Sequence, residues 1–320
     1  MWHVEAELLK YRVVLTLIAT LVLFVLVVLP FSVASMVDDL FASPDGRVFR
    51  ISEVPPGGPA ATHSNLHVTV ATLDEVQRLV TLRVSGHHIC RPACDWSDRV
   101  TLFALAENPG ETEGLPPSGS VSMPPTAVDV THTFQLPIRG NPIRYPFDAY
   151  WIRLGIVHQR VYPDGTLYTL TPRDEPGHMF MTIQEQLSRQ WMSPPAPLDP
   201  QGAQGPEDPY EYLQVFDLSF ARPLYLQVLS VVLVLLAAAA AAYAVFMGPF
   251  HDLIINSGAL VLGVWGIRSI LTPQNMYFVT AIDIALSVVV VFLLGAISVH
   301  ALLIFHKRSG LRNTSPAAGK

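Results

Sequence analysis

Four long apolar blocks constrain this chain more than any other feature. They lie at residues 13–34, 224–247, 253–271 and 278–305, and each is long enough to cross about 30 Å of hydrocarbon as an α-helix. A helix satisfies its own backbone hydrogen bonds, which lipid cannot do. The chain as a whole is also apolar, with 50% hydrophobic and only 14% charged residues. The sequence therefore predicts a multi-pass cell-membrane protein with one N-terminal and three C-terminal transmembrane helices.

Basic residues in the short flanks predict how these helices cross the membrane. They stand before the first block and after the last one, at Lys10, Arg12, Lys307, Arg308, Arg312 and Lys320. Because four crossings bring both ends to the same side, we expect both termini in the cytoplasm. A cleavable signal peptide is the alternative for the first block. An apolar stretch of 22 residues is long for a signal core, so we expect a retained anchor.

These crossings divide the chain into five parts. They are a cytoplasmic N-terminus at 1–12, a first transmembrane helix at 13–35, an external domain at 36–222, a three-helix transmembrane domain at 223–305 and a basic cytoplasmic tail at 306–320. The external part carries 22 Asp and Glu against 13 Arg and no Lys, a formal charge of −9. This charge argues against nucleic acid as a partner.

Apolar and polar residues alternate through the external part, as expected for half-buried strands. The alternation recurs at 66–70, 80–84, 100–105, 128–136, 150–156 and 210–220, and Pro163 to Gly165 reads as a hairpin turn. About eight short strands predict an antiparallel β-sandwich, so the fold class is α+β. Residues 184–191 are expected to form a short helix. His132, on the apolar face of its strand, is expected to lie in the core.

Residues 87–95 hold the only two cysteines of the chain. Outside the membrane an oxidised pair is the default, so Cys90 and Cys94 are predicted to form a disulfide. The alternative is a zinc or copper site with His87 and His88. The spacing is not that of a standard zinc site, and neighbouring side chains on a strand point to opposite faces. We therefore expect no metal.

Two charges interrupt the C-terminal apolar blocks, Arg268 and Asp283. An ion in hydrocarbon is costly unless it is paired or faces a wet or protein-lined interior, so an intramembrane ion pair between the third and fourth helices is predicted. A structural lock is favoured over an ion path, because one pair is not a relay. An inner polar cluster is also predicted from Asp252, Asn256 and His300.

The segment Tyr145, Pro146, Phe147 and Asp148 leads directly into a predicted strand. Pro146 fixes its own φ and favours extended geometry at Tyr145, and Asp148 can accept local backbone N–H bonds. The segment is expected to be a structural corner, with a contact surface for the membrane loops as the alternative.

The arrangement resembles a family of uncharacterised actinobacterial and fungal membrane proteins. It has one N-terminal helix, a β-rich external domain with Tyr145 to Asp148, and three C-terminal helices. The order Arg268, Pro273 and Asp283 matches an Arg in the third helix, a Pro-containing loop and an Asp in the fourth helix of that family. The resemblance implies the topology above and carries no activity.

No catalytic spacing or phosphate-binding glycine loop is present in the sequence. We therefore predict a non-enzymatic protein without a cofactor, embedded in the lipid bilayer. Its external sandwich would bind a partner protein or ligand as an accessory or structural component of a membrane assembly, or the chain would form a homo-oligomer. An oligomeric channel or transporter component is the first alternative. A membrane-anchored enzyme with a site in the sandwich is the second.

Overall fold

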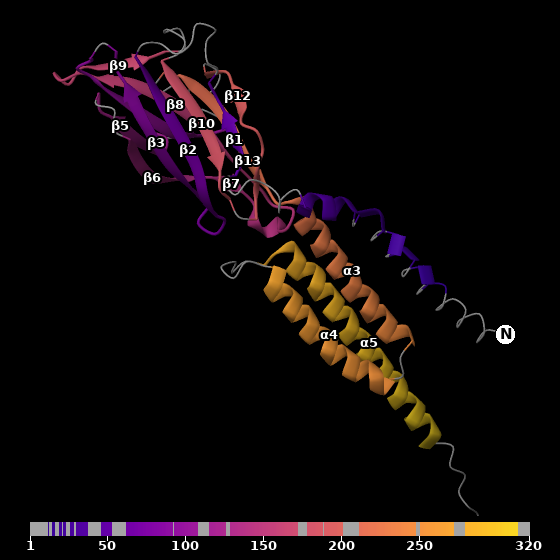
Figure 1. Ribbon diagram of the computed structural model, residues 1–320. Helices are drawn as coiled ribbons and strands as arrows, with labels where there is room; N and C mark the ends of the chain where they lie inside the picture. The colour runs from indigo at the N-terminus through magenta and orange to yellow at the C-terminus, as the bar shows by residue number, and fades with distance from the viewer. Residues whose placement is uncertain are drawn as a thin grey trace, which may run out of the picture. The chain divides into compact units, whose positions relative to one another are not determined.

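The computed structural model divides the chain into two units (Figure 1). It describes residues 46–52, 62–91, 93–107, 115–125, 129–171, 178–187, 189–200, 211–247, 250–271 and 279–312, with scattered residues between 12 and 37. The β unit is Asp38–Pro142 with Phe147–Pro223, and the helical unit is Met1–Val37 with Ile143–Pro146 and Leu224–Lys320. The fold class is α+β, as predicted.

The strands of the β unit form two sheets. The first sheet has the order β1-β10-β2-β3-β6, built from β1 (Val48–Arg50), β10 (Met179–Glu185), β2 (His63–Asp74), β3 (Leu79–Ile89) and β6 (Val130–Pro137). The second has the order β11-β13-β8-β4-β5, built from β11 (Trp191–Met192), β13 (Gln214–Ala221), β8 (Ala149–Val161), β4 (Ser97–Leu105) and β5 (Ser118–Met123). Three short strands extend it, β12 (Ala196–Leu198) on β13, and β7 (Arg139–Gly140) and β9 (Leu167–Leu170) on β8.

One hydrophobic core lies between the two sheets. Leu66, Val68 and Leu82 of the first sheet and Leu102 and Leu154 of the second are fully buried in the same cluster. The alternating residues of β2, β3, β4 and β8 point to that core, because successive strand side chains point to opposite faces. The predicted β-sandwich is therefore present, with more strands than the eight expected.

The predicted hairpin turn joins β8 to β9. The backbone N–H of Gly165 donates to the carbonyl of Tyr162 at 2.9 Å, and Tyr162 N–H donates to the carbonyl of Thr166 at 2.9 Å. Gly165 has a φ of +86°, a conformation that glycine adopts without strain. Asp164 Oδ1 accepts the N–H of Thr166 at 2.9 Å. The turn signal at these residues is confirmed.

Three details of the sandwich differ from the predictions. β10 pairs with β2 in parallel, with Thr182 opposite His67, so the sandwich is not wholly antiparallel. The predicted helix at 184–191 is wrong, because β10 runs to Glu185 and β11 begins at Trp191. His132 is exposed on β6 rather than buried, because β6 is an edge strand of its sheet and, among the described strands, pairs with β3 alone in that sheet.

The helical unit contains α3 (Leu224–Met247), α4 (Phe250–Leu271) and α5 (Ala281–Arg312), which contact one another pairwise and lie side by side in Figure 1. Leu224–Phe246 and Ala281–His306 are long and apolar enough to cross a membrane. Leu253–Gly266 and Leu26–Val37 are shorter apolar helices. α5 continues into the predicted cytoplasmic tail as far as Arg312. In the rest of the predicted first helix, only scattered residues are described, and those are helical.

Candidate functional site

A buried polar cluster lies where four strands of the two sheets come together. It consists of Ser64 on β2, His88 on β3, Asp98 on β4 and His158 on β8, each almost inaccessible to solvent. Each residue occupies an inward position in the alternation of its strand. Buried polar groups of this kind must find partners inside the protein.

The Asp98 carboxylate is the centre of this cluster. Its Oδ2 lies 2.9 Å from His88 Nδ1 and 3.1 Å from His158 Nε2. Ser64 Oγ also donates to Asp98 Oδ2 and lies 2.8 Å from His88 Nδ1. The contact of His158 has an ion-pair distance without hydrogen-bond geometry. Three side chains from three different strands therefore converge on one carboxylate oxygen.

The surroundings of Asp98 favour its charged form. Burial alone would raise the pKa of this carboxyl, but the contacts with His158, His88 and Ser64 hold the pKa well below its usual range. Asp98 Oδ1 and His158 Nδ1 are buried, and neither has a hydrogen-bond partner among the residues that the structure describes. Asp98 is therefore an internal anion that orients the two imidazoles.

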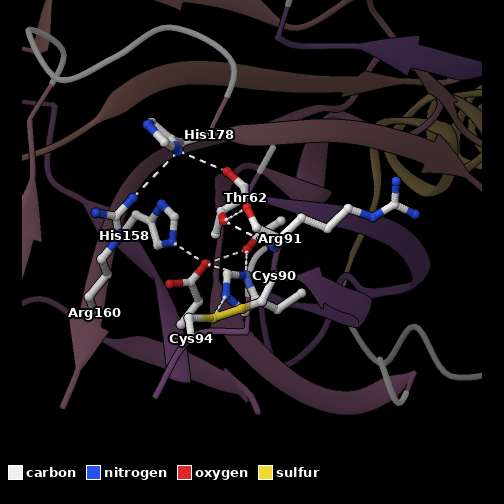
Figure 2. The surroundings of a disulfide bond; sticks show 10 residues. Thr62, Cys90, Arg91, Cys94, His158, Arg160 and His178 are labelled. Atoms are coloured by element: carbon white, nitrogen blue, oxygen red, sulfur yellow. Dashed lines mark hydrogen bonds and ion pairs between the residues drawn. A yellow bond between two sulfur atoms is a disulfide. The ribbon is translucent and has the colours of Figure 1, made fainter. Parts of the chain in front are cut away.

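The Cys90–Cys94 disulfide lies beside this cluster (Figure 2). The Cα atoms of the two cysteines are 5.6 Å apart, within the usual range for a disulfide. His88 Nε2 lies 3.3 Å from Cys94 Sγ, so the imidazole joins Asp98 to the sulfur atoms. His87 is on the other face of β3 and contacts Asn65 Nδ2 at 3.0 Å. The opposite orientation of the two histidines is as expected.

Ser64, His88 and Asp98 do not form a hydrolytic triad. In such a triad the serine and the carboxylate contact different imidazole nitrogens, whereas Ser64 Oγ and Asp98 Oδ2 both contact His88 Nδ1. Ser64 is also completely buried. This geometry disfavours nucleophilic attack by Ser64 on an external substrate.

A second buried charge cluster is centred on Arg222, at the end of the β unit. Arg222 Nε lies 3.1 Å from Asp148 Oδ1, and Nη2 lies 3.1 Å from Asp148 Oδ2. Nη2 also contacts Glu75 Oε1. Glu75 stands in the β2–β3 turn, where Asp74 Oδ1 accepts the N–H groups of Val76 and Gln77.

The surroundings of Arg222 raise the pKa values of two neighbouring groups, Glu75 and Tyr150. Burial is the main reason that the pKa of Glu75 is raised, and the neighbouring Asp148 adds to it, while Arg222 opposes it. Burial, with the nearby Asp148 and Glu75 charges, also raises the pKa of the Tyr150 phenol. Sequence reasoning had assigned only local backbone contacts to Asp148. Its partner Arg222 is 74 residues away along the chain, and no local pattern indicates that distance.

The predicted corner is divided between the two units. Tyr145 and Pro146 belong to the helical unit, whereas Phe147 and Asp148 belong to the β unit. Tyr145 is 2% exposed and belongs to a hydrophobic cluster with Val264 and Ile282. Phe147 is 53% exposed. The Tyr145–Pro146 peptide bond is cis. The corner therefore supplies an aromatic anchor to the helical unit.

Arg268 and Asp283 meet at the start of α5. Arg268 Nε lies 2.5 Å from Asp283 Oδ1. Asp283 Oδ2 accepts the N–H of Thr280 at 2.9 Å, and Thr280 Oγ1 lies 3.3 Å from the N–H of Asp283. This reciprocal arrangement is a capping box. The Thr-x-x-Asp spacing could have indicated it, and it places Asp283 in the first turn of the helix.

The predicted inner polar cluster is only partly covered by the described residues. The side chain of Asp252 lies outside the described residues. Asn256 is exposed on α4, and His300 Nδ1 lies 3.1 Å from the carbonyl of Ala296, one turn earlier on α5. The grouping of these three residues stays a prediction.

An open cleft of about 210 Å³ is lined by residues of β4, β7, β8 and β13. Trp151, 40% exposed on β8, lines it together with Arg139 and Arg153. Arg153 makes a bidentate pair with Asp217, with N–O distances of 2.9 and 3.1 Å. Arg139 lies 3.5 Å from Glu107. Sequence reasoning did not identify this cleft, because its lining comes from strands distant in the chain.

Comparison with models of known protein families found no match, and comparison with curated proteins found none either. The resemblance to a family of uncharacterised membrane proteins therefore stays a prediction. The candidate sites are consequently interpreted from their own geometry.

Proposed function

We propose that this chain is a non-enzymatic integral membrane protein whose β unit binds a partner protein outside the membrane. In this proposal the chain crosses the membrane four times, through an N-terminal helix, α3, α4 and α5. The two long apolar helices support the proposal most directly. Leu262 and Trp265 of α4 and Phe305 of α5 are largely exposed, as side chains facing lipid or another membrane helix would be.

The cleft beside Trp151 is the observation that carries the binding function. Tryptophan and arginine are among the residue types that contribute most to protein–protein binding energy. Here a half-exposed tryptophan is flanked by two arginines. Asp217 and Glu107 neutralise the two arginines, so the cleft offers an apolar anchor within a rim of balanced charge. We infer that the partner inserts an apolar side chain against Trp151 and places polar groups on the rim.

The test compares three forms of the full-length protein purified from its native membranes in mild detergent. The wild type is compared with Trp151→Ala and with Leu167→Ala, a control that removes an exposed apolar side chain of β9 away from the cleft. We expect one protein to co-purify in stoichiometric amount with the wild type and the control, and its recovery to fall at least about tenfold with Trp151→Ala, corresponding to about 1.4 kcal/mol. Equal recovery with all three forms, or no co-purifying protein, would contradict the proposal.

A further inference from the structure

We propose that His88, Cys90 and Cys94 become a binding site for a thiophilic metal ion, zinc(II) or copper(I), when the disulfide is reduced. His88 Nε2 and the two Sγ atoms all lie within 4.8 Å of one another. Zinc bonds of about 2.0–2.3 Å place tetrahedral ligands roughly 3.3–3.8 Å apart. The 3.3 Å separation of His88 Nε2 and Cys94 Sγ is already close to that spacing. One of the three ligand separations is thus already near coordination spacing in the oxidised protein.

The orientation of His88 is the strongest support for this site. A histidine that binds a metal usually donates its other ring N–H to a carboxylate, which fixes the tautomer and makes the ligand more basic. His88 Nδ1 lies 2.9 Å from the Asp98 carboxylate, and this contact leaves the Nε2 lone pair directed at the sulfur atoms. A purely structural disulfide needs no such imidazole. Asp98 is therefore a positioning residue for the proposed ligand.

The exposure of the three ligands fits a site that can be loaded. His88 is buried, whereas Cys90 and Cys94 are only half-buried, so an ion or a reductant can approach from the side of the sulfur atoms. Three protein ligands leave one tetrahedral position for water or another small ligand. Thiolate and imidazole donors select zinc(II) and copper(I) over calcium and magnesium, which prefer oxygen ligands.

The switch to the binding form is a balanced thiol–disulfide exchange. An external dithiol attacks one sulfur, the S–S bond breaks, and the dithiol leaves as its own disulfide after a mixed-disulfide intermediate. Two electrons and two protons thereby reach Cys90 and Cys94, which become thiols. Metal binding then releases the two thiol protons, because thiolates are the ligands. Reoxidation of the cysteines would expel the ion.

The test uses full-length protein in detergent, either oxidised or reduced with a phosphine that is removed without oxygen. Cobalt(II), a coloured substitute for zinc, is titrated into each form, and zinc(II) is then added to displace it. We expect one cobalt per reduced chain with thiolate-to-cobalt charge-transfer absorption, displacement by zinc, and no such absorption in the oxidised form. Cys90→Ser and Cys94→Ser should each abolish the normal spectrum. Absence of the absorption in the reduced wild type would overturn the proposal.

Two further variants assign the imidazole. His87→Gln is the matched control, because His87 lies on the opposite face of β3 and should leave cobalt affinity unchanged. His88→Gln should lose the nitrogen ligand and shift the visible absorption, provided that circular dichroism shows a folded β unit. If His88→Gln does not fold, Asp98→Asn decides the role. It should keep the charge-transfer absorption and weaken cobalt affinity by about 10–100-fold. Unchanged affinity in Asp98→Asn, or equal losses in His87→Gln and His88→Gln, would contradict the assignment.

Discussion

Arg222 is held by two carboxylates that do not contribute equally. Asp148 is completely buried and contacts the guanidinium with both oxygens, whereas Glu75 contacts it through one oxygen and retains some exposure. Removing one partner from a buried charge pair typically costs about 3–5 kcal/mol, because the other charge is left uncompensated. With two carboxylates present, Arg222 remains paired after loss of Glu75 but loses its bidentate partner after loss of Asp148.

We expect Asp148→Asn to lower the thermal unfolding midpoint of the full-length protein more than Glu75→Gln does. The effect of Glu75→Gln should also depend on pH. Because the folded-state pKa of Glu75 is raised, Glu75 contributes stability that is present below its unfolded pKa of about 4.3 and is lost as pH rises through the folded pKa. The deficit of Glu75→Gln relative to wild type should therefore shrink from pH 4 toward neutrality. Parallel pH curves for the two proteins would contradict this reading.

At the scale of elements, Asp283 both caps α5 and pairs with α4. Arg268→Ala removes the ion pair, which is worth about 0–1 kcal/mol for an Arg that is 43% exposed. Asp283→Ala also removes the hydrogen bonds with Thr280 at the helix start, which adds about 1 kcal/mol. We expect Asp283→Ala to be the more harmful change and the double mutant to lose less stability than the sum of the two. Thermal unfolding in detergent checks this, with Ser269→Ala on α4 as the control. Strict additivity would mean that the residues do not interact.

A second prediction at the scale of elements concerns the contribution of Tyr145 to the stability of the helical unit. Tyr145→Ala should destabilise the helical unit by about 3–5 kcal/mol, because it removes a buried aromatic side chain from the cluster with Val264 and Ile282. Phe147→Ala, two residues away and 53% exposed, is the matched control and should change stability by less than about 0.5 kcal/mol. The measurement is the midpoint of helix loss by circular dichroism in detergent. Similar midpoints for the two variants would show that Tyr145 does not anchor the helices.

Local patterns predicted the strands whose neighbours bury one face. Val68 on β2 and Leu82 on β3 alternate with polar residues and are buried as expected. The same logic was wrong for His132, because the position of β6 at a sheet edge is a property of the whole sheet. It was also wrong at 184–191, because the partner of Gln184 is Thr69 on β2, far away in the chain. Local propensity carries no information about such pairings.

The candidate sites show the same division between local and distant information. Cys90 and Cys94 could be paired from the sequence, because they are its only two cysteines and lie in the segment predicted to be external. Ser64, Asp98 and His158 come from three further strands, so the convergence of Ser64, His88 and His158 on the Asp98 carboxylate could not be read from spacing. The capping box at Thr280 was readable, because both of its residues lie within one helical turn.

At the scale of the whole molecule, we predict which side of the membrane the β unit and the C-terminus occupy. The native chain has no free cysteine, so single introduced cysteines can report which side of the membrane they occupy. We expect Ser118→Cys, on the exposed start of β5, to react with a membrane-impermeant maleimide in intact cells. Ala317→Cys in the basic tail should react only after permeabilisation. Labelling of both positions in intact cells, or of neither, would contradict an outer β unit with a cytoplasmic C-terminus.

The strand order β1-β10-β2-β3-β6 constrains how this protein can fold while the ribosome synthesises it. β2 can pair with β3 as soon as their hairpin is made, but its other edge waits for β10, whose Thr182 is 115 residues from His67. At about 5–20 residues per second, that edge stays open for roughly 6–23 s. Arg222 arrives later still, two residues before α3 begins. The last charge needed inside the β unit and the first turn of α3 therefore leave the ribosome almost together, so this domain can close only as α3 emerges.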